Sequence, residues 1–307
     1  MRNAEVKREI IMHFEQIKLK DIDNFGLKDI FECGQCFRWH KEENGSYTGV
    51  VEAGILNVLK ENKEVMIKGY IKDEVSLKNF CEEYFDLKTD YKKIQKEISK
   101  DDQTMKEAIK YGKGIRILNQ NPFEMLISFI ISAANNIPRI SKCIENISHE
   151  YGEKVSIPDD ILKKMCISNK EYYLFPTSKK LSKASMDILR ECNLGFRDKY
   201  VLNAAKLVND KELDLRKVEE LDYKKAKQEL TKVAGVGSKV ADCILLFSMQ
   251  KSEAFPVDTW IKKIMNEVYV ESRNIKKINE YAEEKWGKNA GIAQQYLFYY
   301  KRNSIQK

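Results

Sequence analysis

Residues 228–264 read QELTKVAGVGSKVADCILLFSMQKSEAFPVDTWIKKI and carry the clearest structural pattern in the chain. The pattern predicts a helix that ends near Val233, a turn at Gly235-Val236-Gly237, and a second helix that Ser238 caps. Both glycines are free to adopt positive φ in the tight turn. The arrangement is a helix-hairpin-helix, and the backbone amides at such a turn and helix start are unpaired and available to a DNA phosphate.

A lysine, Lys239, stands immediately inside the second predicted helix. The positive end of the helix dipole disfavours a cation there, and it favours the neutral amine, which is the form that acts as a nucleophile. An acidic residue would serve stability better at this position. Taken alone, Lys239 is better explained as a surface lysine that reaches solvent or a phosphate.

Residues 256–258 read Pro-Val-Asp, and Asp258 is placed to cap the helix that follows. A carboxylate held at a helix start has a fixed position. Near an amine nucleophile it can stabilise developing positive charge and take part in proton transfer. Asp258 alone is more often merely a cap, but the hairpin, Lys239 and Asp258 together form a specific constellation.

The chain has 307 residues, 43% apolar and 33% charged, which suits a globular protein with sizeable cores. Its longest uncharged apolar stretch, at 125–134, is far shorter than the roughly 20 residues that span a bilayer. Residues 1–16 lack the apolar run and cleavage site of a secretory signal, so we expect a cytoplasmic protein with no membrane partner. Seven scattered cysteines then read as reduced thiols, most of them small core residues.

The net charge of +7 is unevenly distributed along the chain. Residues 1–110 carry 20 basic and 22 acidic side chains, whereas residues 111–307 carry 34 basic and 25 acidic ones. A basic lobe of this kind suits a polyanion such as nucleic acid. A solvated lysine-rich surface is the alternative explanation.

Residues 34–71 read as short strands separated by turn residues, with Asn44-Gly45 the clearest turn. This pattern predicts an antiparallel meander. After Ser76 the period becomes helical, and Asn121 is placed to cap a helix whose first residue is Pro122. The predicted fold class is α+β, with an antiparallel sheet domain and flanking helices at 1–110 and an all-helical domain at 111–307.

These motifs resemble the helix-hairpin-helix DNA glycosylase superfamily with its Gly/Pro-Asp loop (HhH-GPD), and within it the 8-oxoguanine DNA glycosylase/AP lyase family. Further matching segments follow in family order: FECGQCFRW at 31–39, YFDL at 84–87, GIRILNQNPFEMLISFIISAANNIPRI at 114–140, LFP at 174–176, LGFRDKYV at 194–201 and NAGIAQQYLF at 289–298. The resemblance implies a sheet of the TATA-binding-protein type, a hairpin at 228–249, a Pro-Val-Asp loop at 256–258 and a helix near 289–300 that completes the base pocket.

In that family the lysine after the hairpin attacks C1′ of the damaged nucleotide, expels the base and forms a Schiff base that permits strand cleavage by β-elimination. Lys239 matches this lysine. Asp258 matches the aspartate that stabilises positive charge on the sugar. Chemistry on a base inside a duplex requires that the nucleotide be flipped out of the stack.

The resemblance also implies a pocket for the flipped base. The base would be stacked between Cys243 and Phe298, while Gln294 would read its edge. The carbonyl of Gly34 would accept the N7–H that distinguishes 8-oxoguanine from guanine. From the residues alone, Cys243 and Phe298 would be core residues and Gln294 a surface amide.

Two further groups of residues follow from the same resemblance. The hairpin amides would bind the DNA backbone at Gly235, Val236, Gly237 and Ser238. The wedge and the contacts to the orphaned base would come from Ala134, Asn135, Arg139, Phe196 and Arg197. Ala134 stands at the first position of the family's asparagine triplet, so the sequence predicts relaxed opposite-base specificity. Two other departures are Ala234, where the family commonly has proline, and Trp260, where animal members have histidine.

The implied partner is double-stranded DNA containing 8-oxoguanine, bound by a monomer that requires no cofactor. The family allows a structural cation on the backbone carbonyls of the hairpin. A related branch carries a four-cysteine iron-sulfur cluster after the catalytic aspartate, and no cysteine occurs after Cys243. That branch is excluded.

Three alternatives remain at this point. A binding-only helix-hairpin-helix module would need phosphate contacts but neither Lys239 nor Asp258. A glycosylase for another lesion would be expected to differ in the base pocket. Cys33 and Cys36 could form a redox pair or half of a zinc site, but no second cysteine pair has matching spacing.

Overall fold

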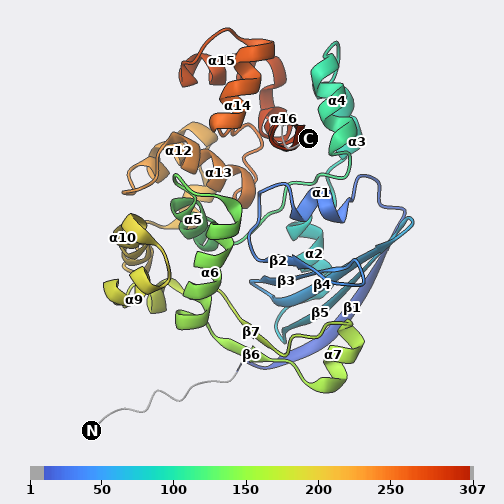
Figure 1. Ribbon diagram of the computed structural model, residues 1–307, viewed down its shortest axis with the longest axis vertical. Helices are drawn as coiled ribbons and strands as arrows, with labels where there is room; N and C mark the ends of the chain where they lie inside the picture. The colour runs from blue at the N-terminus through green and yellow to red at the C-terminus, as the bar shows by residue number, and fades with distance from the viewer. Residues whose placement is uncertain (1–9, 305–307) are drawn as a thin grey trace.

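The computed structural model describes residues 10–304, which form a twisted sheet beside a larger group of helices (Figure 1). Residues 1–9, which belong to the amino-terminal segment considered above, and residues 305–307 lie outside the described part. Within the described part, no helix is long and apolar enough to cross a membrane.

The sheet has five antiparallel strands in the order β1-β5-β4-β3-β2. Strands β2 to β5 form the predicted meander: β2 Trp39–Lys41, β3 Tyr47–Val51, β4 Gly54–Glu61 and β5 Glu64–Lys72. The sequence pattern did not reveal β1, Met12–Lys20, which pairs with β5 along its whole length. One face of the sheet packs against α1, Leu27–Phe31, and α2, Leu77–Tyr84.

A segment from the second half of the chain covers the other face of the sheet. It consists of β6, Lys154–Ser156, α7, Asp159–Met165, and β7, Glu171–Tyr173, and it lies beside the sheet in Figure 1. Val155 and Leu162 from this segment share a core with Ile55 of β4. The expectation of an all-helical region at 111–307 therefore needs correction, because this two-stranded sheet belongs to it.

The remaining elements are mostly helices that gather around one large core. They are α3 Tyr91–Ile98, α4 Gln103–Tyr111, α5 Pro122–Ile131, α6 Ile137–Tyr151, α8 Ser178–Leu181, α9 Met186–Glu191, α10 Asp198–Asn209, α11 Leu215–Glu220, α12 Tyr223–Thr231, α13 Ser238–Ser248, α14 Thr259–Ile264, α15 Ile275–Trp286 and α16 Ala290–Ser304. Short 3-10 turns lie at Gly195–Arg197 and Gly287–Asn289, and a π turn at Met265–Tyr269. Helix α4 lies beside α16 (Figure 1).

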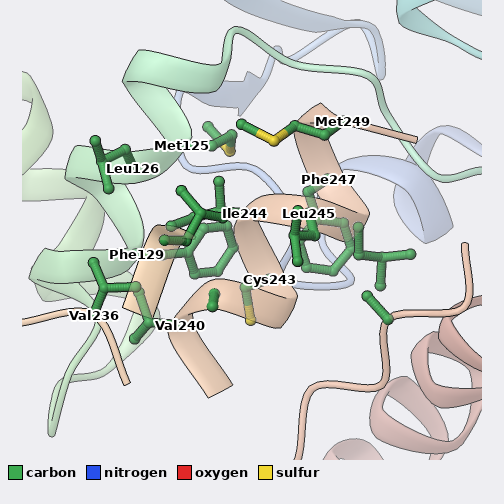
Figure 2. Close-up of a cluster of buried hydrophobic side chains, with 14 of the residues drawn as sticks. Met125, Leu126, Phe129, Val236, Val240, Cys243, Ile244, Leu245, Phe247 and Met249 are labelled. Carbon is green, nitrogen blue, oxygen red and sulfur yellow. The ribbon is translucent and has the colours of Figure 1, made fainter. Parts of the chain in front are cut away.

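The packing of α5 against α13 forms the centre of this core. Asn121 caps α5 as predicted, accepting from the amides of Phe123 and Glu124 at 3.0 Å each. Phe129 of α5 stacks on Phe247 of α13 with 5.6 Å between ring centroids. Figure 2 shows both rings together with Cys243, which lies on α13 with Phe247. This contact fixes α13, whose first turn carries Lys239.

Candidate active site

Helices α12 and α13 form the predicted hairpin, and a buried ion pair joins them. The Lys227 ammonium lies 2.7 Å from one oxygen of the Asp242 carboxylate, and the Tyr223 hydroxyl donates to the other at 2.8 Å. Burial raises the pKa of Asp242 to about 6, although Lys227 opposes the shift. These contacts hold the turn between the two helices in place.

Two details of the turn differ from the prediction. Only Gly235 uses positive φ, at +90°, whereas Gly237 has φ −87° and ψ 178°, which is ordinary extended backbone. Gly237 is also the N-cap of α13, and no side chain caps this helix. Ser238 is therefore the first helical residue rather than the cap. This position leaves the amides of the first turn of α13 without intrahelical partners.

The hairpin residues are unequally placed for an approaching phosphate. The Val236 amide donates to the Val233 carbonyl at 3.0 Å and its side chain is buried, so this amide is not free. A Cβ at Gly235 would meet the ring of Tyr200 at 2.8 Å, and the fold itself therefore requires glycine there. Around Gly237 no atom would lie within 4 Å of such a Cβ. The open surface of the turn lies at Gly237 and Ser238.

Lys239 is half-buried at the junction of α5 and α13. Its Nζ donates to the hydroxyl of Ser132 at 3.5 Å and lies 5.3 Å from the ring centroid of Phe129. Ser132 is the C-cap of α5, so the end of one helix and the start of the other define the position of the amine. Cys243, one turn further along α13, is buried, and burial raises the pKa of its thiol to about 11 against the opposing charge of Lys239.

Asp258 caps α14 as predicted, with its Oδ1 accepting from the Ile261 amide at 2.8 Å. Burial raises the pKa of this carboxyl group, and the Ile261 amide and the Lys239 ammonium act in the opposite direction. The charge of Lys239 thus acts on the Asp258 carboxyl group. Trp260, two residues further on, is half-buried.

Two of the predicted pocket residues, Gly34 and Phe298, lie against each other. Gly34 has φ +92°, and a Cβ there would lie 3.1 Å from Cε1 of Phe298. Gln294, one turn before Phe298 on α16, is buried, and its Oε1 has no hydrogen-bond partner among the described residues. Helix α16 packs against α14, the helix that Asp258 caps.

The loop around Gly34 holds a feature that sequence reasoning missed. Side chains from elsewhere in the chain bind the carbonyls on both sides: Arg302 donates to Glu32 O at 2.6 Å, Gln295 to Cys33 O at 2.9 Å and Gln120 to Gln35 O at 2.8 Å. Within residues 10–304, the Gly34 carbonyl, which lies between the bound carbonyls of Cys33 and Gln35 in the chain, accepts no hydrogen bond. Such long-range pairs leave no local signal in the sequence.

The turn after α5 carries the residues predicted to face the orphaned base. Ala134 is exposed with φ +49°, a left-handed conformation that alanine adopts at a cost and asparagine tolerates better. The Asn135 side chain donates to Ile131 O at 3.2 Å. Arg139 is exposed at the start of α6.

Arg197 and Phe196 lie against this turn. The Arg197 guanidinium is buried and donates to the carbonyls of Ala133, Ala134 and Leu194. It therefore supports the turn, and a contact with a base would require it to exchange partners. Phe196 is 58% exposed, with the Arg197 guanidinium carbon 4.3 Å from its ring centroid. An exposed aromatic ring beside the turn has the shape that a wedge requires.

Cys33 and Cys36 are buried free thiols. Burial raises the pKa of Cys33 to about 11 and that of Cys36 well above its usual value. Six of the seven cysteines are buried, which confirms their assignment as core residues, and Cys166 is exposed. Among residues 10–304, no three metal-ligating side chains gather into a site.

Comparison with known proteins identifies the family. Residues 17–126 match the 8-oxoguanine DNA glycosylase N-terminal domain, and residues 127–288 match the HhH-GPD superfamily base excision DNA repair proteins. An N-glycosylase/DNA lyase of Saccharomyces cerevisiae is 31% identical over 89% of this chain and 82% of its own length. A probable N-glycosylase/DNA lyase of Methanothermobacter thermautotrophicus is 28% identical over 92% and 95%.

A solved structure agrees with this assignment. The 8-oxoguanine glycosylase/lyase of Clostridium acetobutylicum, crystallised with double-stranded DNA containing cytosine opposite 8-oxoguanine, is 45% identical. It superimposes with a TM-score of 0.87 over 96% of this chain and 98% of that one. The chain belongs to the 8-oxoguanine DNA glycosylase family of the HhH-GPD superfamily and is a DNA N-glycosylase/lyase.

Proposed function

We propose that this enzyme flips 8-oxoguanine out of duplex DNA, removes it with Lys239 as the nucleophile, and nicks the strand through a Schiff base. The observation that carries the proposal is a half-buried amine, Lys239, in the first turn of the helix that follows the hairpin, where its charge acts on the half-buried Asp258 carboxyl group. A binding-only module would have no use for an amine and a carboxylate placed within electrostatic range of each other.

In the proposed reaction, the neutral Nζ of Lys239 attacks C1′, the bond from C1′ to N9 breaks, and the base leaves with the bonding electron pair. Asp258 stabilises the positive charge on the sugar, accepts a proton from the new ammonium group and passes it to the departing base. Opening of the bond from C1′ to O4′ gives the imine. Loss of a 2′ proton then expels the 3′-phosphate, which is the β-elimination.

The base pocket supports 8-oxoguanine as the substrate. An acceptor that the fold leaves unpaired, at Gly34, suits a base with an N7–H and repels the N7 lone pair of guanine. Phe298 and Cys243 supply stacking surfaces, and the unpaired Gln294 Oε1 is suited to a donor on the base edge. We infer that these four residues read the base.

Borohydride trapping tests this proposal directly, because borohydride reduces a Schiff base to a stable amine. The wild-type enzyme and a duplex with 8-oxoguanine opposite cytosine should yield a covalent complex. Duplexes with undamaged guanine or with an alkylated purine are the comparison. Trapping on the alkylated purine in preference to 8-oxoguanine would contradict the substrate assignment.

Gly237→Val should weaken binding to all duplexes by about tenfold or more, because its side chain would block the phosphate that the α13 amides bind. The backbone at Gly237 is ordinary, so the melting temperature should stay near that of the wild type. Affinities for lesion-bearing and undamaged duplexes, measured by fluorescence anisotropy, should fall in parallel. A loss confined to the lesion-bearing duplex would contradict this role.

Ala134→Asn should widen the preference for cytosine opposite the lesion by about one to two orders of magnitude, since a good base contact contributes roughly 1–3 kcal/mol. We propose that the wild type, with alanine in this exposed turn, discriminates less among the four opposite bases. Single-turnover excision of 8-oxoguanine opposite each base measures the effect. Equal strictness in wild type and variant would show that Ala134 does not set this specificity.

The same proposal places the enzyme on DNA in the cytoplasm as a monomer. Its chemistry needs no cofactor, because an amine supplies the nucleophile, and activity should survive EDTA. A structural cation on the hairpin carbonyls would act on stability rather than on the chemical step.

A further inference from the structure

Arg302 forms the end of a stripe on α16 that already contains two pocket residues. Gln294, Phe298 and Arg302 follow one another at intervals of one helical turn and therefore lie on one side of the helix. The guanidinium carbon of Arg302 lies 5.2 Å from the ring centroid of Phe298 and 5.6 Å from that of Tyr299. These aromatic faces and the bond to Glu32 O fix the orientation of the guanidinium.

One nitrogen of the Arg302 guanidinium has no hydrogen-bond partner among the described residues. Nη2 binds the Glu32 carbonyl, but Nη1 is buried and has no hydrogen-bond partner among the described residues. Nη1 lies 2.9 Å from the position of a Cβ at Gly34, on the same side of Gly34 as Phe298. A buried donor without a partner is costly, and it is retained where a ligand supplies the acceptor.

The two unpaired groups at this end of the pocket form a complementary pair. The Gly34 carbonyl is an acceptor, and Arg302 Nη1 is a donor that lies 2.9 Å from the position of a Cβ on the same residue. The lesion edge of 8-oxoguanine carries a donor at N7–H next to an acceptor at O8. Guanine carries an N7 lone pair and a carbon-bound hydrogen at the same two positions. An acceptor and a donor side by side therefore match the lesion and mismatch the normal base on both atoms.

We propose that Arg302 is a specificity-determining residue that donates from Nη1 to O8 of the flipped base while Gly34 accepts from N7–H. This inference rests on the proposed function, and it adds a second lesion-specific contact to the one at Gly34. Arginine suits the task because its planar fork binds Glu32 O with one nitrogen and presents the other to the base. Lysine has a single nitrogen and cannot hold both positions in the same geometry.

The test compares two substrates in the same enzyme preparation: duplexes with 8-oxoguanine or 8-thioguanine opposite cytosine. The thiocarbonyl sulfur keeps N7–H but is a much weaker acceptor than O8. Arg302→Met should lower kcat/KM on 8-oxoguanine by about tenfold or more, the effect of losing a charge-assisted hydrogen bond. On 8-thioguanine the loss should be less than about threefold.

The ratio of the two rates does not depend on the folded fraction, so partial unfolding of the variant cannot imitate this result. Arg302→Lys should likewise reduce the preference for 8-oxoguanine, because it keeps the charge but not the fork. Lys301→Met is the matched control. It removes one positive charge from the neighbouring position, where Lys301 pairs with Glu267, and should leave the ratio of rates unchanged.

Equal losses on both substrates in Arg302→Met would overturn the contact with O8 and leave Arg302 as a support for the Glu32 carbonyl alone. An unchanged ratio in Arg302→Lys would overturn it as well. A wild-type enzyme with no activity on either duplex would refute the proposed function itself, which separates the two failures.

Discussion

Lys239→Gln should lose base excision by roughly 10³-fold or more while keeping its affinity for DNA, because removing a covalent nucleophile abolishes the pathway that depends on it. Glutamine has a similar length and can still pack on Phe129 and reach Ser132, so the fold should be preserved. Single-turnover excision on an 8-oxoguanine duplex, borohydride trapping and anisotropy measure rate, covalent chemistry and affinity separately.

Lys232→Gln serves as the control for lost charge. Lys232 lies at the end of α12 and pairs with Glu229 on the exposed surface of the same hairpin. The Lys232→Gln variant should still form the borohydride-trapped complex and keep most of the excision activity. A covalent complex formed by Lys239→Gln at the wild-type level would assign the Schiff base to a different amine.

Asp258→Asn should reduce the rate of excision by about 10²–10³-fold, as expected when a group that stabilises transition-state charge is neutralised. Asparagine is as good an N-cap as aspartate, so the bond to the Ile261 amide and the start of α14 should persist. Affinity for the lesion duplex should change little, because the charge on the sugar develops only in the transition state.

The pH profile provides a second measurement on Asp258. Burial raises the pKa of this carboxyl group, so it becomes protonated at a higher pH than an ordinary aspartate. The wild-type rate should therefore fall on the acid side as Asp258 loses its charge, in addition to the fall that follows protonation of the Lys239 amine. Only the part that belongs to Asp258 should be absent in Asp258→Asn. Asp222→Asn is the matched control, since Asp222 caps α12 on an exposed surface. An acid limb in Asp258→Asn that is unchanged from the wild type would assign all of it to other groups.

The sequence predicted the parts of the site that depend on local chemistry. Asn121 and Asp258 cap helices as their positions indicated, because capping is decided within four residues. The hairpin followed from its glycines for the same reason. The sequence did not predict that only Gly235 has positive φ and only Gly237 has open space around it. This difference depends on Tyr200, which packs over Gly235 from α10.

The parts that the sequence left open are long-range. Strand β1 carries charged residues along much of its length and becomes a strand through its pairing with β5. The paired residues lie 44 to 60 positions apart in the chain, from Lys20 with Glu64 to Met12 with Lys72. Segment 154–173 was expected to belong to an all-helical domain, and its two short strands form where the sheet supplies the apolar face that the segment covers. The carbonyl of Gly34 stands out as unpaired only because residues from distant elements donate hydrogen bonds to the carbonyls of Cys33 and Gln35.

The loop around Gly34 also links the base pocket to the docking of α16. Two of the carbonyls in the loop around Gly34 accept hydrogen bonds from Arg302 and Gln295, which both lie on α16. The same helix carries Gln294 and Phe298. Undocking of α16 would remove the proposed lesion-reading contacts and the proposed base-stacking surface in one event. A molecule in which α16 has undocked would then lose its activity rather than its selectivity for the lesion. It would therefore not excise normal guanine.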